Sequence, residues 1–117
     1  MLFRSAAVEA VLCSLADAID NLADCGITAQ RVILIGGAAR SEAVRTIAPV
    51  IFGVPVTVPA PAEYVALGAA RQAAWALSGA AEAPRWPLAG PAEYTAEPTP
   101  QVREQYAALR DATVGWG

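Results

Sequence analysis

The sequence predicts an α/β fold with parallel strands, in a segment that belongs to a larger domain. The order of elements along the 117 residues is helix, strand, helix, strand and helix, which implies crossover connections between parallel strands. An apolar run over residues 31–35 leads directly into a glycine pair, as buried strands of parallel sheets do. Only two strands are predicted, however, and two are too few for an independent sheet domain.

The first predicted helix covers residues 2–24. Apolar residues recur along it at steps of three and four and form one stripe, made of Val8, Leu12, Leu15, Ile19 and Leu22. Gly26 suits the left-handed conformation that ends a helix. The strand at residues 31–35 shows no alternation and is β-branched at three of five positions, so we expect it to be buried on both faces.

The second helix is expected to begin after Ser41, whose side chain would serve as its N-cap. Pro49 lies inside this helix and predicts a kink or a break near Ala48. Gly53 would end it. The helix therefore reads as one short element interrupted before its end.

The next strand is predicted at residues 54–58, where Pro55 restricts it to a sheet edge or to the start of a strand. A third helix runs from about residue 63 to residue 77, and Glu63 is expected to cap it. Its small residues around Gly68 favour close packing against a neighbouring helix. Trp75 in the same helix is expected to pack rather than to stack on a ligand.

The last part of the chain changes character. Residues 80–100 contain five prolines without periodicity and predict an irregular segment that wraps a surface, with Trp86 as an anchor. Residues 101–112 predict a short final helix, with Tyr106 and Leu109 on one side. We therefore divide the chain into residues 1–80, the α/β part, and residues 81–117, the wrapping segment and terminal helix.

Composition also predicts an incomplete unit. Hydrophobic residues make up 56% of the chain and charged residues 16%, against roughly 25% charged in an average soluble domain. The surplus apolar surface would be covered by the rest of a longer polypeptide or by a second subunit. The net charge is −3 and the arginines are scattered, so we expect no binding to nucleic acid or to a membrane.

Few residues in the chain suit acid–base or metal chemistry. Histidine, the commonest general base and metal ligand, is absent. Cys13 and Cys25 lie too far apart on one helix for a disulfide and are expected to be reduced thiols of a cytoplasmic protein. The carboxylates of the first helix are expected to be solvated rather than catalytic: Glu9, Asp17, Asp20 and Asp24.

The strand–turn–helix junction at residues 31–42 is the one candidate ligand-binding site in the sequence. Gly36 and Gly37 follow the carboxyl end of the strand, where ligands bind in open α/β sheets. Glycine lets the backbone approach a ligand closely, and the following helix offers unpaired N–H groups. The spacing is neither a P-loop nor a dinucleotide-binding fingerprint, so the local sequence alone favours a plain tight turn in which glycine avoids a clash.

Four segments in the right order resemble the FGGY carbohydrate kinases, and most of all the xylulose kinases of that family. Residues 32–41, Val-Ile-Leu-Ile-Gly-Gly-Ala-Ala-Arg-Ser, resemble the family's adenosine-motif turn. Residues 63–73 resemble its Ala-Leu-Gly-Ala-Ala helix. Residues 3–11 and 94–109 resemble its preceding helix and its closing segment. The resemblance covers nearly the whole chain.

This resemblance implies the C-terminal part of an actin-like, ribonuclease-H-like ATPase domain, in an enzyme that transfers the γ-phosphoryl group of ATP to a sugar with Mg²⁺. By position, Gly36 and Gly37 would touch the phosphate and ribose region of ATP or ADP. Arg40 would lie at the nucleotide cleft and Ser41 near the adenine. Ala38 replaces the family's third glycine and would crowd the nucleotide slightly.

The family's catalytic aspartate, sugar-binding residues and first phosphate loop match nothing in this chain, so the resemblance assigns no catalytic residue and no metal ligand here. It implies an inactive fragment whose partner is the remainder of the kinase, including its sugar-binding half, or a second subunit. Three alternatives stay open: a family member acting on glycerol, gluconate or another pentulose, a non-catalytic binding or assembly module, and a Rossmann-like nucleotide binder.

Overall fold

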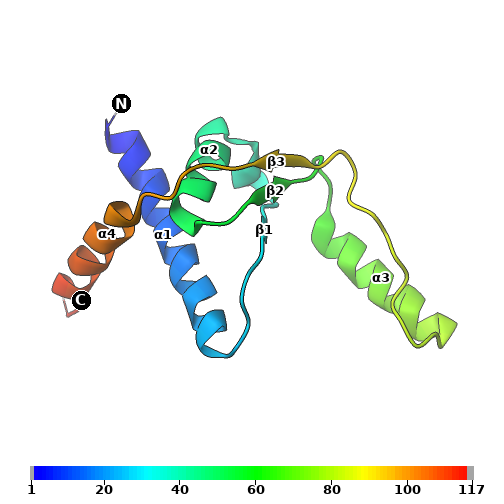
Figure 1. Ribbon diagram of the computed structural model, residues 1–117. Helices are drawn as coiled ribbons and strands as arrows, with labels where there is room; N and C mark the ends of the chain where they lie inside the picture. Colours follow the sequence, from blue (N-terminus) through cyan, green and yellow to red (C-terminus); the bar gives the residue numbers. More distant parts are fainter. Residues whose placement is uncertain (1, 116–117) are drawn as a thin grey trace.

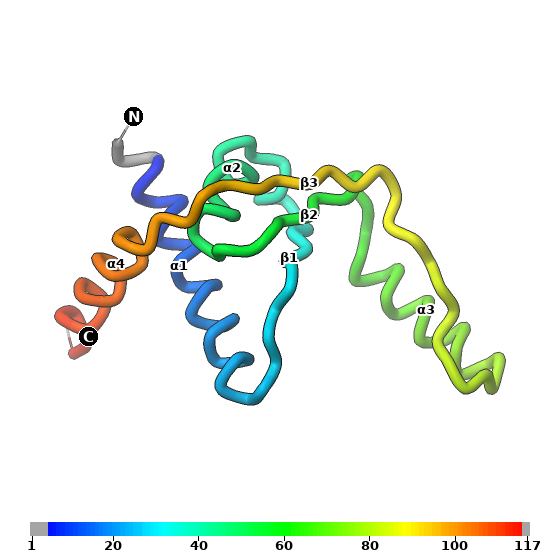
Figure 2. Tube along the Cα trace, viewed as in Figure 1, coloured from blue at the N-terminus to red at the C-terminus, as the bar shows by residue number. Residues whose placement is uncertain are grey.

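A computed structural model describes residues 2–115 (Figures 1 and 2). The elements are α1 (Leu2–Asp24), β1 (Val32–Ile33), the 3-10 helix η1 (Gly37–Arg40), α2 (Glu42–Phe52), β2 (Val56–Val58), α3 (Tyr64–Ser78), β3 (Ala92–Tyr94) and α4 (Pro100–Ala112). The predicted alternation of helices and strands is confirmed. Within this described part, no helix combines the length and the apolar character that a membrane span needs.

The three strands form one sheet in the order β1-β2-β3. β1 and β2 are parallel, as predicted, with Val32 opposite Val56. The sequence pattern does not predict β3, which pairs antiparallel with the other edge of β2, because so short a strand depends on its partner rather than on its own residues. Pro55 lies directly before β2, and its carbonyl accepts the Val32 N–H at 2.9 Å. β2 is therefore central, and the edge placement allowed for it is wrong.

The core lies between α1, α2 and one face of the sheet. Its buried residues are Leu12, Cys13, Ala16, Ala39, Ala48, Ile51, Val56 and Val58. The predicted stripe of α1 is only partly used, since Leu15 and Leu22 are 47% and 49% exposed. The expectation that the first strand is buried on both faces is also wrong, because Ile33 is 42% exposed. Within residues 2–115, no second layer of helices covers that face of the sheet.

α2 runs from Glu42 to Phe52, so the break that was one of the two outcomes predicted near Ala48 is wrong. Pro49 removes one backbone donor, but it is one of the largest fully buried side chains of the molecule. Packing in the core therefore offsets the missing hydrogen bond. The helix ends at Gly53, which has the left-handed backbone expected of it (φ 67°).

α3 projects away from the other elements, and residues 79–91 return along it (Figure 1). The radius of gyration is 17.0 Å, against about 13 Å for a compact domain of roughly this length. The small residues Ala66, Gly68 and Ala69 are exposed. Among the described elements none packs against them, so the expected close helix pair is not formed within this chain.

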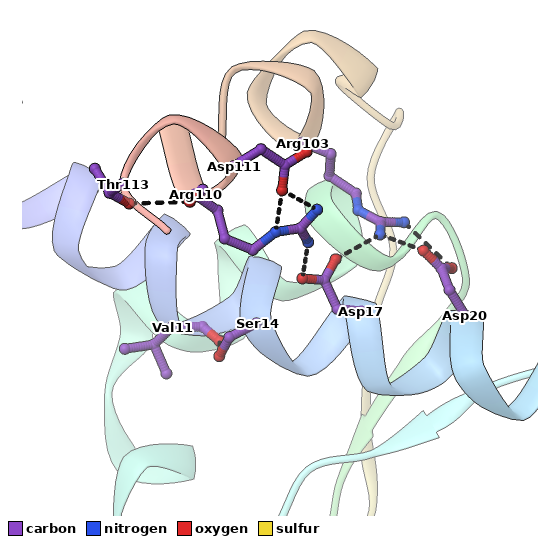
Figure 3. Close-up of polar contacts among 8 residues, drawn as sticks. All are labelled: Val11, Ser14, Asp17, Asp20, Arg103, Arg110, Asp111 and Thr113. Atoms are coloured by element: carbon purple, nitrogen blue, oxygen red, sulfur yellow. Dashed lines mark hydrogen bonds and ion pairs between the residues drawn. The ribbon is translucent and has the colours of Figure 1, made fainter. Parts of the chain in front are cut away.

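α4 is held against α1 by ion pairs (Figure 3). Asp17 accepts hydrogen bonds from Arg103 at 3.4 Å and from Arg110 at 2.6 Å, and Asp20 accepts from Arg103. The hydrogen bond to Asp20 is the main cause that raises the pKa of the Arg103 guanidinium above its usual value. The interpretation of Asp17 and Asp20 as merely solvated is therefore wrong, because the final helix folds back over them.

Candidate functional site

The predicted glycine turn borders a pocket of about 200 Å³ at the carboxyl ends of β1 and β2. Its lining includes Gly36, Gly37, Ala39, Arg40, Arg45, Glu63 and Tyr64. The structure thus brings together three of the five predicted site residues, while Ala38 and Ser41 lie in the turn outside the lining. Small-molecule sites have volumes of roughly 300–1,000 Å³, so this pocket has room for part of a nucleotide.

The two glycines of the turn differ in why they are glycine. Gly36 has φ 92° and ψ −173°, a conformation that is essentially restricted to glycine. Gly37 lacks a positive φ, and a Cβ built on it meets no heavy atom within 4 Å. Nothing in the described residues therefore requires glycine at position 37. Its open backbone leaves room for an atom from outside this segment.

Ser41 occupies the N-cap position of α2, as predicted, with an extended backbone. Its hydroxyl, however, makes no capping hydrogen bond within the described residues, so that part of the prediction is wrong. η1 runs directly into Ser41, whose N–H donates to the carbonyl oxygen of Ala38 at 3.0 Å. Glu63 likewise stands at the N-cap of α3 without a capping bond from its side chain in this part of the structure.

Arg45 is the residue of this pocket that the sequence analysis misses. Its Nε–H donates to the carbonyl oxygen of Ala39 at 2.5 Å, so the side chain links α2 to the turn. One signal could have found it: Arg45 lies one helical turn after Ser41, and residues four apart share a helix face.

The pocket has a mixed charge. Arg40 and Arg45 line it together with one carboxylate, Glu63. Within residues 2–115, no group of three or more Asp, Glu, Cys or His side chains is placed to hold a metal ion. The pocket thus offers backbone and cationic groups to an anionic ligand, but the described residues do not fit a Mg²⁺ site.

The two tryptophans that the structure describes, Trp75 and Trp86, do not line this pocket. The Trp75 indole N–H donates to the carbonyl of Ala80 at 2.7 Å, at the far end of α3. Trp86 is 46% exposed and lines a separate groove between β1 and α3. Trp116 lies outside the described residues.

Two parallel strands with a glycine turn at their carboxyl ends are a feature that many nucleotide-binding domains share. The comparison with protein families identifies the family to which this chain belongs. Residues 2–77, more than half of the chain, match the FGGY family of carbohydrate kinases, C-terminal domain. The chain therefore belongs to this family, and the resemblance noted in the sequence is confirmed.

Among solved structures, the chain is similar to the xylulose kinase from Bifidobacterium adolescentis, with 52% sequence identity and a TM-score of 0.77. The match covers 88% of this chain and 20% of that kinase, so the chain spans about a fifth of the length of the protein it matches. The fold is accordingly that of the C-terminal domain of an actin-like ATPase. The comparison with curated proteins finds no match.

Proposed function

We propose that this chain forms the nucleotide-side wall of an ATP-dependent sugar kinase, with residues 36–41 as the contact surface. The observation that carries the proposal is the pocket beside Gly37, where open backbone meets a recess at the carboxyl edge of the sheet. Membership of a carbohydrate kinase family supports a phosphorylated ligand there. The proposed location in the cytoplasm follows from the same activity, since ATP and sugars are cytoplasmic substrates.

Each residue of the turn has a proposed part in holding ATP or ADP. Gly36 and Gly37 let the backbone approach the phosphate and ribose region. Arg40, exposed at the rim, offers its charge to a phosphate. Ser41 and Ala38 do not line the pocket, and they would meet the nucleotide only where it extends beyond that pocket.

When bound, ATP supplies the phosphoryl group, and Mg²⁺ neutralises its charge. The described residues contain no group of three or more side chains placed to hold a metal ion, so we assign no metal ligand to them. We assign no catalytic residue, because the family's catalytic aspartate matches nothing in this chain. Those groups would come from the remainder of the kinase or from a second subunit, and the isolated chain is proposed to be inactive. The role left to these residues is to bind and orient the nucleotide.

The proposed acceptor of the complete enzyme is D-xylulose, which would become D-xylulose 5-phosphate. The support is the 52% identity with a xylulose kinase, since other members of the family act on other sugars. A non-catalytic binding module is the competing function. It predicts the same fold without affinity for a nucleotide.

Isothermal titration calorimetry of ADP into the 117-residue chain tests the nucleotide wall. We expect weak, saturable binding with a Kd on the order of 1 mM, about −4 kcal/mol, because only one wall of the site is present. Gly37→Val should weaken binding at least tenfold by filling the open backbone. A coupled kinase assay with D-xylulose should detect no turnover by the chain alone.

Gly68→Ala is the matched control, because Gly68 also lacks a positive φ and also has no heavy atom within 4 Å of a built Cβ. It does not line the pocket, so ADP affinity should stay unchanged. Absence of ADP binding by the unaltered chain contradicts the proposal and favours the non-catalytic module. Clear turnover by the isolated chain contradicts the assignment of catalysis to other parts of the enzyme.

A further inference from the structure

We propose that Arg45 is a positioning residue of the nucleotide pocket, which holds the glycine turn in shape through Ala39 and does not itself bind phosphate. The inference rests on the proposed function, because it assigns a role at the same pocket. It separates the two arginines that line this pocket into one that shapes it and one that meets the ligand.

The carbonyl of Ala39 needs a donor from outside the turn. Two bonds close η1 internally, from Ala39 N–H to Gly36 and from Ser41 N–H to Ala38, at 3.2 and 3.0 Å. The last carbonyls of a helix have no donor from their own helix, and Ala39 is only 6% exposed. A buried carbonyl left without a donor is unfavourable. The Arg45 Nε–H, at 2.5 Å, meets this need.

The same geometry leaves Arg45 poorly suited to bind a phosphate. Its side chain is 26% exposed, and its Nε is already occupied by Ala39. Its Nη1 lies 3.9 Å from the Glu42 carboxylate, which would oppose an incoming anion. Arg40, in contrast, is exposed and forms no ion pair with any of the described residues.

Three substitutions separate a hydrogen-bonding role from a charge role. In Arg45→Gln the amide nitrogen occupies the place of the Arg Nε, since both follow three carbons from the backbone, so the bond to Ala39 can form without a charge. Arg45→Lys keeps the charge and lacks the Nε–H. Arg45→Met keeps most of the apolar stem and loses both the donor and the charge.

Titrations with ADP and with adenosine measure the consequence for the ligand. We expect Arg45→Met and Arg45→Lys to weaken both ligands by a similar factor of at least ten, while Arg45→Gln stays within about threefold of the unaltered chain. Arg40→Met is the contrasting variant and should weaken ADP more than adenosine. Recovery by Lys but not by Gln, or a loss confined to ADP, would overturn the inference.

Amide hydrogen exchange of Arg40 and Ser41, without any ligand, gives a readout that does not depend on nucleotide binding. Exchange should accelerate at least tenfold in Arg45→Met and remain near the unaltered rate in Arg45→Gln. If the unaltered chain does not bind ADP but these exchange rates change as expected, the proposed nucleotide-binding role is wrong. The proposal that Arg45 positions the glycine turn would then still be supported. Unchanged exchange in Arg45→Met overturns the positioning role itself.

Discussion

The two regions of this molecule obey the same local rules and differ in what they pack against. In the packed region, α1, α2, the sheet and α4 enclose a small core with Leu12 1% exposed. In the arm, formed by α3 and residues 79–91, Leu77 is 92% and Val65 84% exposed. Both regions contain helices with clear ends, so the presence of a helix does not show whether its apolar side chains are packed against another element.

The two edges of the sheet differ in the same way. β1 uses the N–H groups of Val32 and Leu34 to bond β2, and no other described strand pairs with its opposite edge. β2, in contrast, is closed on its far edge by β3 from the chain's own tail. The C-terminal segment thus closes the β2 edge of the sheet. Ile33 in β1 and Val65 and Leu77 in α3 remain exposed, and so do apolar side chains of α1 and α4.

Thiol labelling gives the largest expected contrast between the regions. Cys13 is buried and Cys25 exposed, and burial raises the pKa of the Cys13 thiol, which lowers its thiolate fraction. We expect a maleimide to modify Cys25 at least a hundredfold faster than Cys13. A third thiol from Ala69→Cys in α3 should react within a few-fold of Cys25. A rate near that of Cys13 would mean that the arm is packed after all.

The next largest contrast is expected when one leucine in each region is replaced by alanine. Leu12→Ala removes a core side chain between α1 and α2 and should lower the free energy of unfolding by about 2–5 kcal/mol. Leu77→Ala, on the exposed arm, should change it by less than about 0.5 kcal/mol. Urea unfolding followed by circular dichroism measures both. Equal losses would contradict the division into a packed region and an arm.

The sequence predicts the helices well because their periodicity and end signals are local. Gly26, Gly53 and Gly79 end three helices with positive φ, as glycine does at helix ends. β3 and the unbroken α2 could not be predicted, because a three-residue strand and a tolerated Pro49 both depend on tertiary partners. The division of the chain at residue 80 stays a prediction.

The candidate site was predictable only in part. Gly36, Gly37 and Arg40 are found from the strand–turn pattern, since that pattern is continuous in the sequence. Arg45 is missed because its contact with Ala39 depends on how α2 is oriented on η1. The contacts of Asp17 with α4 are missed for the same kind of reason, since their partners lie about ninety residues further along the chain.

The ion pairs between α1 and α4 should contribute less to the free energy of unfolding than the buried Leu12 side chain does. Asp17→Asn removes the charge that meets both Arg103 and Arg110, and at low salt we expect a loss of about 1 kcal/mol, as for partly exposed ion pairs. The loss should shrink in 1 M NaCl, where charges are screened. Asp24→Asn, on an exposed residue of the same helix that forms no ion pair with the described residues, is the control. A loss that is independent of salt would point to packing rather than to charge.

Substitution of Thr57 should have the smallest effect on the free energy of unfolding, and it is the only change expected to increase it. It is 3% exposed in β2, and its hydroxyl oxygen has no hydrogen-bond partner within residues 2–115. Its neighbours Val56 and Val58 point into the core, so Thr57 points to the opposite face of the sheet, on the side of the exposed Ile33. Because an unpaired buried hydroxyl is unfavourable, Thr57→Val should raise the free energy of unfolding by up to about 1 kcal/mol. Thr46→Val, which removes a hydroxyl bonded to Glu42 at 2.9 Å, should give no gain. Destabilisation by Thr57→Val would show that this hydroxyl has a hydrogen-bond partner.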